Sequence, residues 1–241
     1  MKRIPILVLI SLCLSVLFIL TSCEGSSEKS IEGSITYDVT FPYVKNKVLL
    51  NVFPEEMTMT FKNEQTHSIL QSLGGIVSTE FIANEKERTF SQYLKSFQER
   101  YSMELNEKQV FQYIANMPSM RLEPTGEKDS VAGFLCDKTI AHFNIDSVPP
   151  VILYHTKEIA LNQPNWYTQY KDVDGVLLGY ELEQYGMRMK LLAKEVKLEP
   201  ISENRFKVDQ EYMKINTERM EQVIDSLMLS FGASDFFGGE E

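Results

Sequence analysis

An alternating run near the start of the chain constrains its fold most strongly. Across residues 31–41, apolar or small residues occupy every second position, and charged or hydroxyl-bearing residues fill the positions between them. A period of two places successive side chains on opposite faces of a β-strand. The run therefore predicts a half-buried strand, which ends at Pro42 because proline has no backbone donor for a sheet.

Further segments with strand-like composition follow, separated by polar stretches. Gly74-Gly75, residues 125–130 and Asp174-Gly175 are predicted turns, because glycine accepts the positive φ angles of tight turns. Short strands joined by short turns favour antiparallel meanders over parallel units with crossover helices. The predicted strands after the first cover residues 57–61, 67–73, 76–83, 88–95, 131–143, 151–155, 176–185, 187–198 and 206–208.

Two helices are predicted beside these strands. Asn106 can cap a short central helix over residues 107–114, and Thr217 can cap a helix that runs to Phe231. The second helix carries an apolar stripe at three- and four-residue spacing, so it needs a surface to pack against. The predicted fold class is mainly β (α+β), a curved antiparallel sheet or half-barrel covered by the C-terminal helix and the short central helix. The stripe consists of Met220, Val223, Ile224, Leu227, Met228 and Phe231.

The N-terminal residues predict export and lipid attachment. Lys2 and Arg3 precede an apolar run over residues 4–20, which is too short and too early for an ordinary membrane-spanning helix. Leu-Thr-Ser-Cys at residues 20–23 resembles a bacterial lipobox, in which the Cys23 thiol carries a diacylglyceryl group. The alternative is an uncleaved anchor helix that ends in cysteine. We expect a lipoprotein signal peptide at 1–22, an acyl (palmitate-type) anchor on Cys23, and no other cofactor.

Composition predicts the organisation of the remaining chain. Residues 23–30 are small and polar and predict a flexible tether, residues 31–231 predict a single half-barrel domain, and residues 232–241 predict a disordered acidic tail. The formal net charge is −10. An acidic chain lacks the cations that replace counterions on nucleic acid or on anionic headgroups. We therefore expect no nucleic-acid partner, and membrane attachment only through the lipid anchor.

Residues that carry chemistry are sparse. His67, His142 and His155 lie far apart without the spacing of a zinc motif, and no nucleophile elbow, phosphate loop or dinucleotide fingerprint is present. The one acid/base or metal arrangement to test is His142 beside His155 on adjacent strands. Cys136 lies in a strand-like run and is expected to be a buried apolar residue rather than a reactive thiol. We therefore expect no catalytic residue, no metal site and no enzyme activity.

Four segments carry a resemblance to a family. Residues 125–138, 151–159, 170–181 and 189–196 resemble, in order and spacing, the DUF4412 type of secreted Bacteroidetes protein. More remotely, this type is similar to the LolA/LolB/LppX lipoprotein carriers. The resemblance covers roughly residues 31–215 and implies a curved half-barrel with helices over its concave side. The chain departs from the carriers in one respect, because they are soluble whereas Cys23 would anchor this chain. No motif places the carriers' functional residues here.

Methionine and aromatic residues on the predicted strands suggest a place for an apolar ligand. Flexible thioether side chains adapt to irregular partners, so grooves for varied hydrophobic ligands often contain them. The alternative is that the same side chains form a plain core beneath the C-terminal helix. The predicted ligand-lining residues are Tyr37, Val39, Phe41, Met57, Met59, Phe61, Leu178, Tyr180, Met187 and Met189.

These observations favour a lipid-anchored envelope lipoprotein without catalytic activity. Its predicted role is to bind a hydrophobic ligand, either a lipid or a lipidated peptide, in the concave side of the half-barrel. The competing hypothesis is a structural or interaction subunit with a closed core, which docks another envelope protein and binds no small ligand. The acidic, serine-containing tether after Cys23 resembles the export tethers of the group that the domain resembles, and this resemblance implies the outer membrane, at its periplasmic face or at the cell surface.

Overall fold

The structure is a computed structural model that describes residues 31–42, 44, 50–145, 148–184, 187–208 and 211–231. The chain divides into two compact units, Met1–Ser30 and Ile31–Glu241, and all described residues belong to the second. The predicted signal peptide, the anchor at Cys23, the tether and the acidic tail lie outside the described residues, as do the side chains of Glu183, Gln184 and Met187. The predicted domain boundaries therefore stay predictions.

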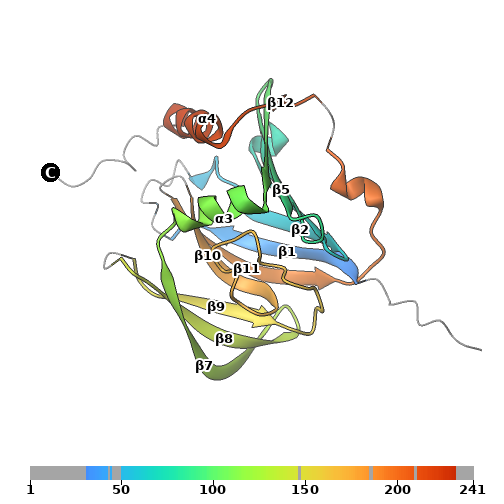
Figure 1. The fold of residues 1–241 in the computed structure, drawn as a ribbon, viewed down its shortest axis with the longest axis vertical. Coiled ribbons are helices and arrows are strands. Elements are labelled where there is room, and N and C mark those ends of the chain that lie inside the picture. The colour runs from blue at the N-terminus through green and yellow to red at the C-terminus, as the bar shows by residue number, and fades with distance from the viewer. Residues whose placement is uncertain are drawn as a thin grey trace, which may run out of the picture. The chain divides into compact units, whose positions relative to one another are not determined.

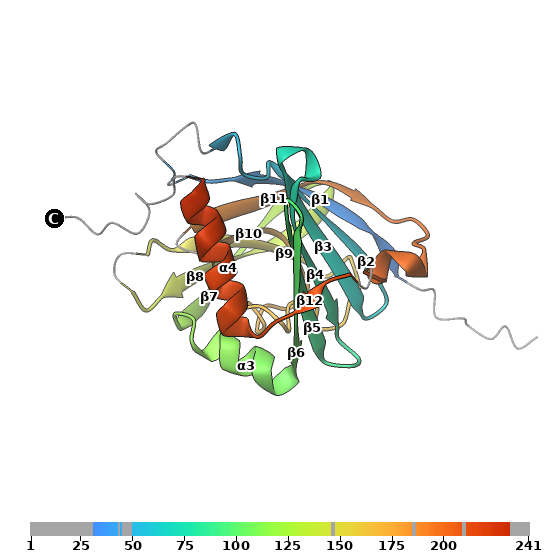
Figure 2. The same ribbon diagram turned by 90° about the horizontal axis from the view of Figure 1, so that it is seen from above.

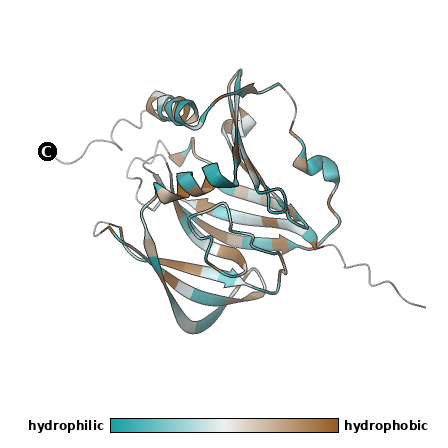
Figure 3. Cartoon of the chain, viewed as in Figure 1, coloured by the Kyte–Doolittle hydropathy of each residue, from teal (hydrophilic) through white to brown (hydrophobic). Residues whose placement is uncertain are grey.

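The described residues form one sheet of 12 strands. Apolar residues recur along its strands as brown bands, interrupted by polar residues (Figure 3). In chain order the strands are β1 (Glu32–Thr40), β2 (Glu56–Lys62), β3 (Gln65–Ser72), β4 (Val77–Asn84), β5 (Thr89–Ser96), β6 (Glu99–Asn106), β7 (Met120–Val131), β8 (Phe134–Phe143), β9 (Val151–Thr156), β10 (Val176–Gln184), β11 (Met187–Lys197) and β12 (Met213–Lys214).

The strand order is β12-β6-β5-β4-β3-β2-β1-β11-β10-β9-β8-β7, so β1 joins the first and second halves of the chain (Figure 1). Neighbouring strands are antiparallel, except that the short β12 pairs in parallel with β6. The sheet curves but does not close into a barrel, because β7 and β12 remain at opposite edges. The predicted fold class, a curved and mainly antiparallel sheet with two covering helices, is confirmed.

Both predicted helices lie on the concave side of the sheet (Figure 2). The central helix is α3 (Glu107–Ala115), and Asn106 caps it as predicted, in a capping box with Gln109. The C-terminal helix is α4 (Thr217–Ser230), but its N-cap is Asn216 and not Thr217, because the Asn216 side chain accepts a hydrogen bond from the Arg219 amide. Its stripe buries Met220, Ile224 and Met228 against the sheet.

Several predicted elements are wrong in detail. The predicted turn at 125–130 lies within β7, where a register shift between Pro124 and Lys128 and the positive φ of Gly126 form a bulge. The chain turns later, at Ala132 and Gly133, before β8. The strand predicted at 206–208 is absent, because Phe206 is the last residue of the 3-10 helix η2 (Glu203–Phe206) and the two residues after it form no strand. Strands β6 and β12 were not predicted. A second 3-10 turn, η1 (Leu73–Gly75), occupies the predicted turn at Gly74-Gly75.

Buried apolar residues form two clusters on this framework. The larger one, the main cluster, joins β1–β6, β10 and β11 to α3, α4 and the segment after β9, and it includes Ile35, Tyr37, Phe61 and Met220. The smaller one, the β8–β9 cluster, lies under the segment that links β9 to β10. It consists of Ala141, Val151, Leu153, Tyr170, Val173 and Leu177.

Candidate ligand-binding site

A cavity of about 130 Å³ lies within the main cluster, and we call it the first cavity. Strands β1–β5, β10 and β11 form its walls, and the end of α3 and the β9–β10 segment complete them. It is lined by Tyr37, Met57, Met59, Ser68, Leu70, Phe81, Phe90, Tyr113, Met117, Pro164, Asn165, Tyr167, Thr168, Gln169, Val176, Leu177, Tyr180, Leu182, Met189 and Leu191.

A second cavity of about 110 Å³ lies between the sheet and α4. Leu70, Phe81 and Met189 line both cavities, so three side chains separate one space from the other. Because methionine is unbranched and flexible, a change of rotamer at Met189 can alter this partition without moving the backbone. The other lining residues are Phe41, Val52, Phe53, Pro54, Ser72, Val77, Ser78, Thr79, Leu94, Ile224, Leu227, Met228 and Phe231.

The predicted ligand-lining residues fall into two groups. Val39, Phe61 and Leu178 are buried members of the main cluster and border neither cavity. The Met187 side chain lies outside the described residues. The others border a cavity, and whether they bind a ligand stays a prediction. Tyr37, Met57, Met59 and Tyr180 line the first cavity, Phe41 lines the second, and Met189 lines both.

The sequence interpretation missed a large part of this lining. Leu70 and Phe81 lie on strands that were predicted, but their faces were not assigned to the concave side. Tyr167 comes from the β9–β10 segment, and its ring stacks on Phe90 with centroids 5.4 Å apart. Its neighbour Trp166 is buried, as expected for a segment that packs on the sheet. The available signal was the aromatic density of this segment, which does not say which ring faces a cavity.

Tyrosine hydroxyls supply much of the polarity around the first cavity. Tyr37 donates a hydrogen bond to the Leu177 carbonyl at 2.8 Å, and Tyr170 donates to the Glu181 carbonyl at 2.5 Å. The Tyr180 ring lies edge-on to both, with centroids 5.8 Å from Tyr37 and 6.3 Å from Tyr170. Burial raises the pKa of Tyr37, Tyr170 and Tyr180 above the ordinary tyrosine value. These hydroxyls are therefore neutral donors at physiological pH.

The predicted pairing of His142 with His155 is wrong. On β8 and β9, Asp137 is opposite His155 and Ala141 is opposite Val151, so His142 lies beyond the start of β9. His142 is about 16 Å along the strand from the position opposite His155. It lies instead beside Glu123 on β7, with His142 Nε2 3.2 Å from a carboxylate oxygen. The proposed acid/base pair therefore does not form.

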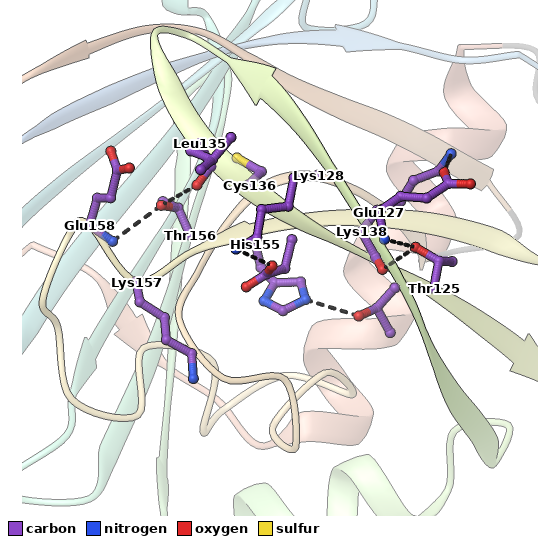
Figure 4. Close-up of polar contacts among 12 residues, drawn as sticks. Thr125, Glu127, Lys128, Leu135, Cys136, Lys138, His155, Thr156, Lys157 and Glu158 are labelled. Carbon is purple, nitrogen blue, oxygen red and sulfur yellow. Dashed lines mark hydrogen bonds and ion pairs between the residues drawn. The ribbon is translucent and has the colours of Figure 1, made fainter.

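Each of the other histidines has a local structural role. His155 Nε2 lies 2.9 Å from the Thr139 hydroxyl, and its Nδ1 lies 2.7 Å from the Asp174 carbonyl, so the ring ties β8 to the β9–β10 segment. Figure 4 shows His155 among the polar contacts of β7–β9. His67 lies between the Glu80 carboxylate and the Arg205 carbonyl. Within the described part of the chain, no group of three His, Cys, Asp or Glu residues can hold a metal ion.

Cys136 is completely buried, as its strand-like context predicts. Burial raises the pKa of its thiol to about 11. A thiol with this pKa is almost wholly protonated at neutral pH and is a poor nucleophile.

Among the described residues, no helix has the length and the apolar composition needed to cross a membrane.

The sequence matches no protein-family profile and no curated protein. Among solved structures, the fold is similar to a chain in the MucA/MucB complex of Pseudomonas aeruginosa, with a TM-score of 0.31 and 10% identity. That match covers 78% of this chain and 58% of the other, so the chain spans less than two thirds of that protein's length.

A second similar structure is a β-barrel-like protein of the domain of unknown function DUF1849 from Brucella abortus. Its TM-score is 0.26 at 7% identity, and the match covers 70% of this chain and 98% of the other. Likeness at this level carries no argument about function or partners. The resemblance to DUF4412 proteins and lipoprotein carriers stays a prediction from the sequence motifs.

Proposed function

We propose that this chain is a non-catalytic binding protein that holds a hydrophobic ligand, either a lipid or a lipidated peptide, on the concave side of its sheet. The observation that carries the proposal is the first cavity, whose lining is mostly aliphatic, aromatic and methionine side chains. Small-molecule sites are typically concave and apolar, with a few polar groups that orient the ligand. The adjoining second cavity extends the apolar space beneath α4.

The methionine side chains in the cavity walls indicate which type of ligand the cavities can hold. Met57, Met59 and Met189 line the first cavity, and Met228 of α4 lines the second. Thioether side chains repack at low cost, so a wall that contains them adapts to chains of different length and branching. The competing hypothesis of a closed core gives no role to two apolar cavities that share three side chains. The cavities therefore favour ligand binding over a purely structural role.

We also propose that the protein works at the cell envelope, held by acyl chains on Cys23. The apolar run at 4–20 and the Leu-Thr-Ser-Cys sequence support this proposal, and the resemblance of the tether after Cys23 to export tethers supports the outer membrane. Two or more acyl chains hold a protein firmly, because each buried methylene contributes about 0.8 kcal/mol. Intact-mass measurement of the protein from its native host tests the anchor. A mass without a diacylglyceryl increment contradicts it.

Filling the cavity tests the binding role. We expect Met189→Trp to place a larger ring between the two cavities and to lower the affinity for a neutral apolar dye, such as Nile red, about tenfold or more. The matched control is Met213→Trp on β12, where the native side chain is 64% exposed and borders neither cavity. We expect this variant to bind dye as the wild type does. Equal dye affinity in all three proteins, or no dye binding by the wild type, contradicts the proposal and favours the interaction subunit.

A further inference from the structure

Neither cavity contains a charged group in its described lining. No Lys, Arg, His, Asp or Glu is among the described residues that line them, although these residue types are abundant elsewhere in the chain. A carboxylate or phosphate that entered this space would lose its hydration without gaining a cation. That cost is far larger than the cost of burying a neutral carbonyl that accepts a hydrogen bond. The buried part of a ligand must therefore be uncharged.

One polar group at the first cavity is free to interact with such a ligand. The Tyr37 hydroxyl donates to the Leu177 carbonyl, and the Asn165 amide donates to the carbonyls of Val173 and Gly175. The Tyr167 hydroxyl is hydrogen-bonded with the Thr66 and Ser68 side chains, the Gln169 side chain is hydrogen-bonded with Tyr170, and Tyr113 also has a partner. The Thr168 hydroxyl donates to the Asn165 carbonyl. Among the described residues, these groups already have protein partners.

The Tyr180 hydroxyl differs from them. It has no hydrogen-bond partner among the described residues, and its ring lies edge-on to Tyr37 and Tyr170 and packs against both apolar clusters. It is also not one of the polar atoms that are sealed from solvent without a hydrogen bond. In the described part these are His142 Nε2 and Glu181 Oε2, and each of them has an ion-pair contact instead. The Tyr180 hydroxyl therefore keeps accessible surface in a residue that lines the first cavity.

We propose that the first cavity selects a neutral acyl group, with an apolar chain along the methionine wall and an ester or amide carbonyl that accepts a hydrogen bond from the Tyr180 hydroxyl. This inference rests on the proposed function and specifies the ligand class of the same site. Tyr180 is a specificity-determining residue in this account. A free fatty acid is excluded at neutral pH, because its carboxylate finds one hydroxyl and no cation in the described lining.

Competition against a bound neutral dye tests the inference on the full-length protein. The three probes share a twelve-carbon chain: methyl dodecanoate, dodecane, and dodecanoate at pH 8. We expect the ester to bind more tightly than dodecane by about threefold to tenfold, which is the net effect of one hydrogen bond. We expect dodecanoate to bind at least about tenfold more weakly than the ester.

Substitutions assign this preference to one hydroxyl. We expect Tyr180→Phe to remove the preference for the ester over dodecane and to leave dodecane affinity unchanged. The control is Tyr170→Phe, which removes a buried tyrosine hydroxyl that borders neither cavity and should keep the ester preference. An ester preference that survives in Tyr180→Phe, or dodecanoate binding as tight as that of the ester, overturns the inference. If no probe and no dye binds the wild type, the proposed function itself fails.

A further arm separates two sources of acyl groups. Didecanoyl phosphatidylcholine represents membrane lipid, and a diacylated cysteine peptide represents a lipidated protein. We expect both to lose affinity in Tyr180→Phe, and the tighter of the two in the wild type identifies the source. If neither loses affinity, the Tyr180 hydroxyl does not recognise the carbonyl and the inference is wrong.

Discussion

The two apolar clusters of the sheet are closed in different ways. The β8–β9 cluster is filled by its own side chains: Tyr170 and Leu153 are fully buried, and Leu177 is its one member in the described lining of the first cavity. The main cluster is larger, and it borders both cavities. One curved sheet thus has a tightly packed end and a loosely packed middle.

The two clusters also differ in the elements that cover them. The β8–β9 cluster is covered by a segment that hydrogen bonds hold at several points, through the Asn165 amide, the Tyr170 hydroxyl and His155. The second cavity in the main cluster is covered by α4, which lines it through Ile224, Leu227 and Met228, and by the C-cap residue Phe231. An amphipathic helix packs by its apolar stripe alone. Shifting it therefore costs less free energy than shifting a segment that is fixed by buried hydrogen bonds. The second cavity therefore lies under a cover that is not fixed by such bonds, whereas the first cavity lies partly under the β9–β10 segment.

Truncating one side chain in each cluster gives the largest expected contrast. We expect Leu153→Ala to lower the free energy of unfolding by about 3 kcal/mol, because it opens a cavity in a filled region. We expect Met57→Ala to cost about half as much, roughly 1.5 kcal/mol, since its flexible side chain already borders empty space. Urea denaturation measures both losses in the free energy of unfolding, provided that the m-value of each variant equals that of the wild type. Equal losses would show that the two clusters are packed alike.

Removing the hydrogen bonds that hold the β9–β10 segment should have a smaller effect. We expect Asn165→Ala to lower the free energy of unfolding by about 2 kcal/mol, because two backbone carbonyls lose their buried donor. The control is Asn162→Ala in the same segment, where the exposed side chain bonds Glu85 and the expected change is below about 0.5 kcal/mol. Similar stability in the two variants would show that buried hydrogen bonds do not fix this cover.

The smallest expected effect concerns Cys136, a buried residue of the main cluster that borders neither cavity. Its folded-state pKa is raised to about 11, whereas the unfolded thiol titrates near its ordinary value. The unfolded state therefore releases its proton first, and stability is lost as the pH rises from about 9 to 11. Between pH 8 and pH 10, we expect the free energy of unfolding of the wild type to fall by about 1 kcal/mol more than that of Cys136→Ala. If the free energies of unfolding of the two proteins change equally with pH, the Cys136 thiol is not completely buried.

The sequence predicts the strands and helices better than it predicts the cavities. Strands and helices follow local residue patterns, whereas a cavity depends on how separate segments pack together. Alternation over 31–41 predicts β1, and Asn106 predicts the start of α3. The same alternation occurs in β6, where Tyr101, Met103 and Leu105 face one side, but Glu99 and Arg100 at its start obscure it.

The cavities depend on quantities that a single strand pattern does not contain. Met57 and Met59 alternate in the same way whether the space opposite them is filled or empty. The volume left over depends on where Tyr167 and α4 pack, and on the bulge between Leu177 and Gly179 in β10. The 125–130 segment shows the same limit at a smaller scale, since its residues suit either a turn or a bulge within a strand.

Native mass spectrometry of the protein purified gently from its own host shows whether the concave side of the sheet holds a ligand. We expect one bound lipid or lipidated peptide per chain, which organic extraction removes. Met189→Trp should retain this compound poorly, whereas Met213→Trp should retain it fully. A chain that carries no such compound, and that takes up none when it is offered in excess, would contradict the claim that the concave side of the sheet is a binding site.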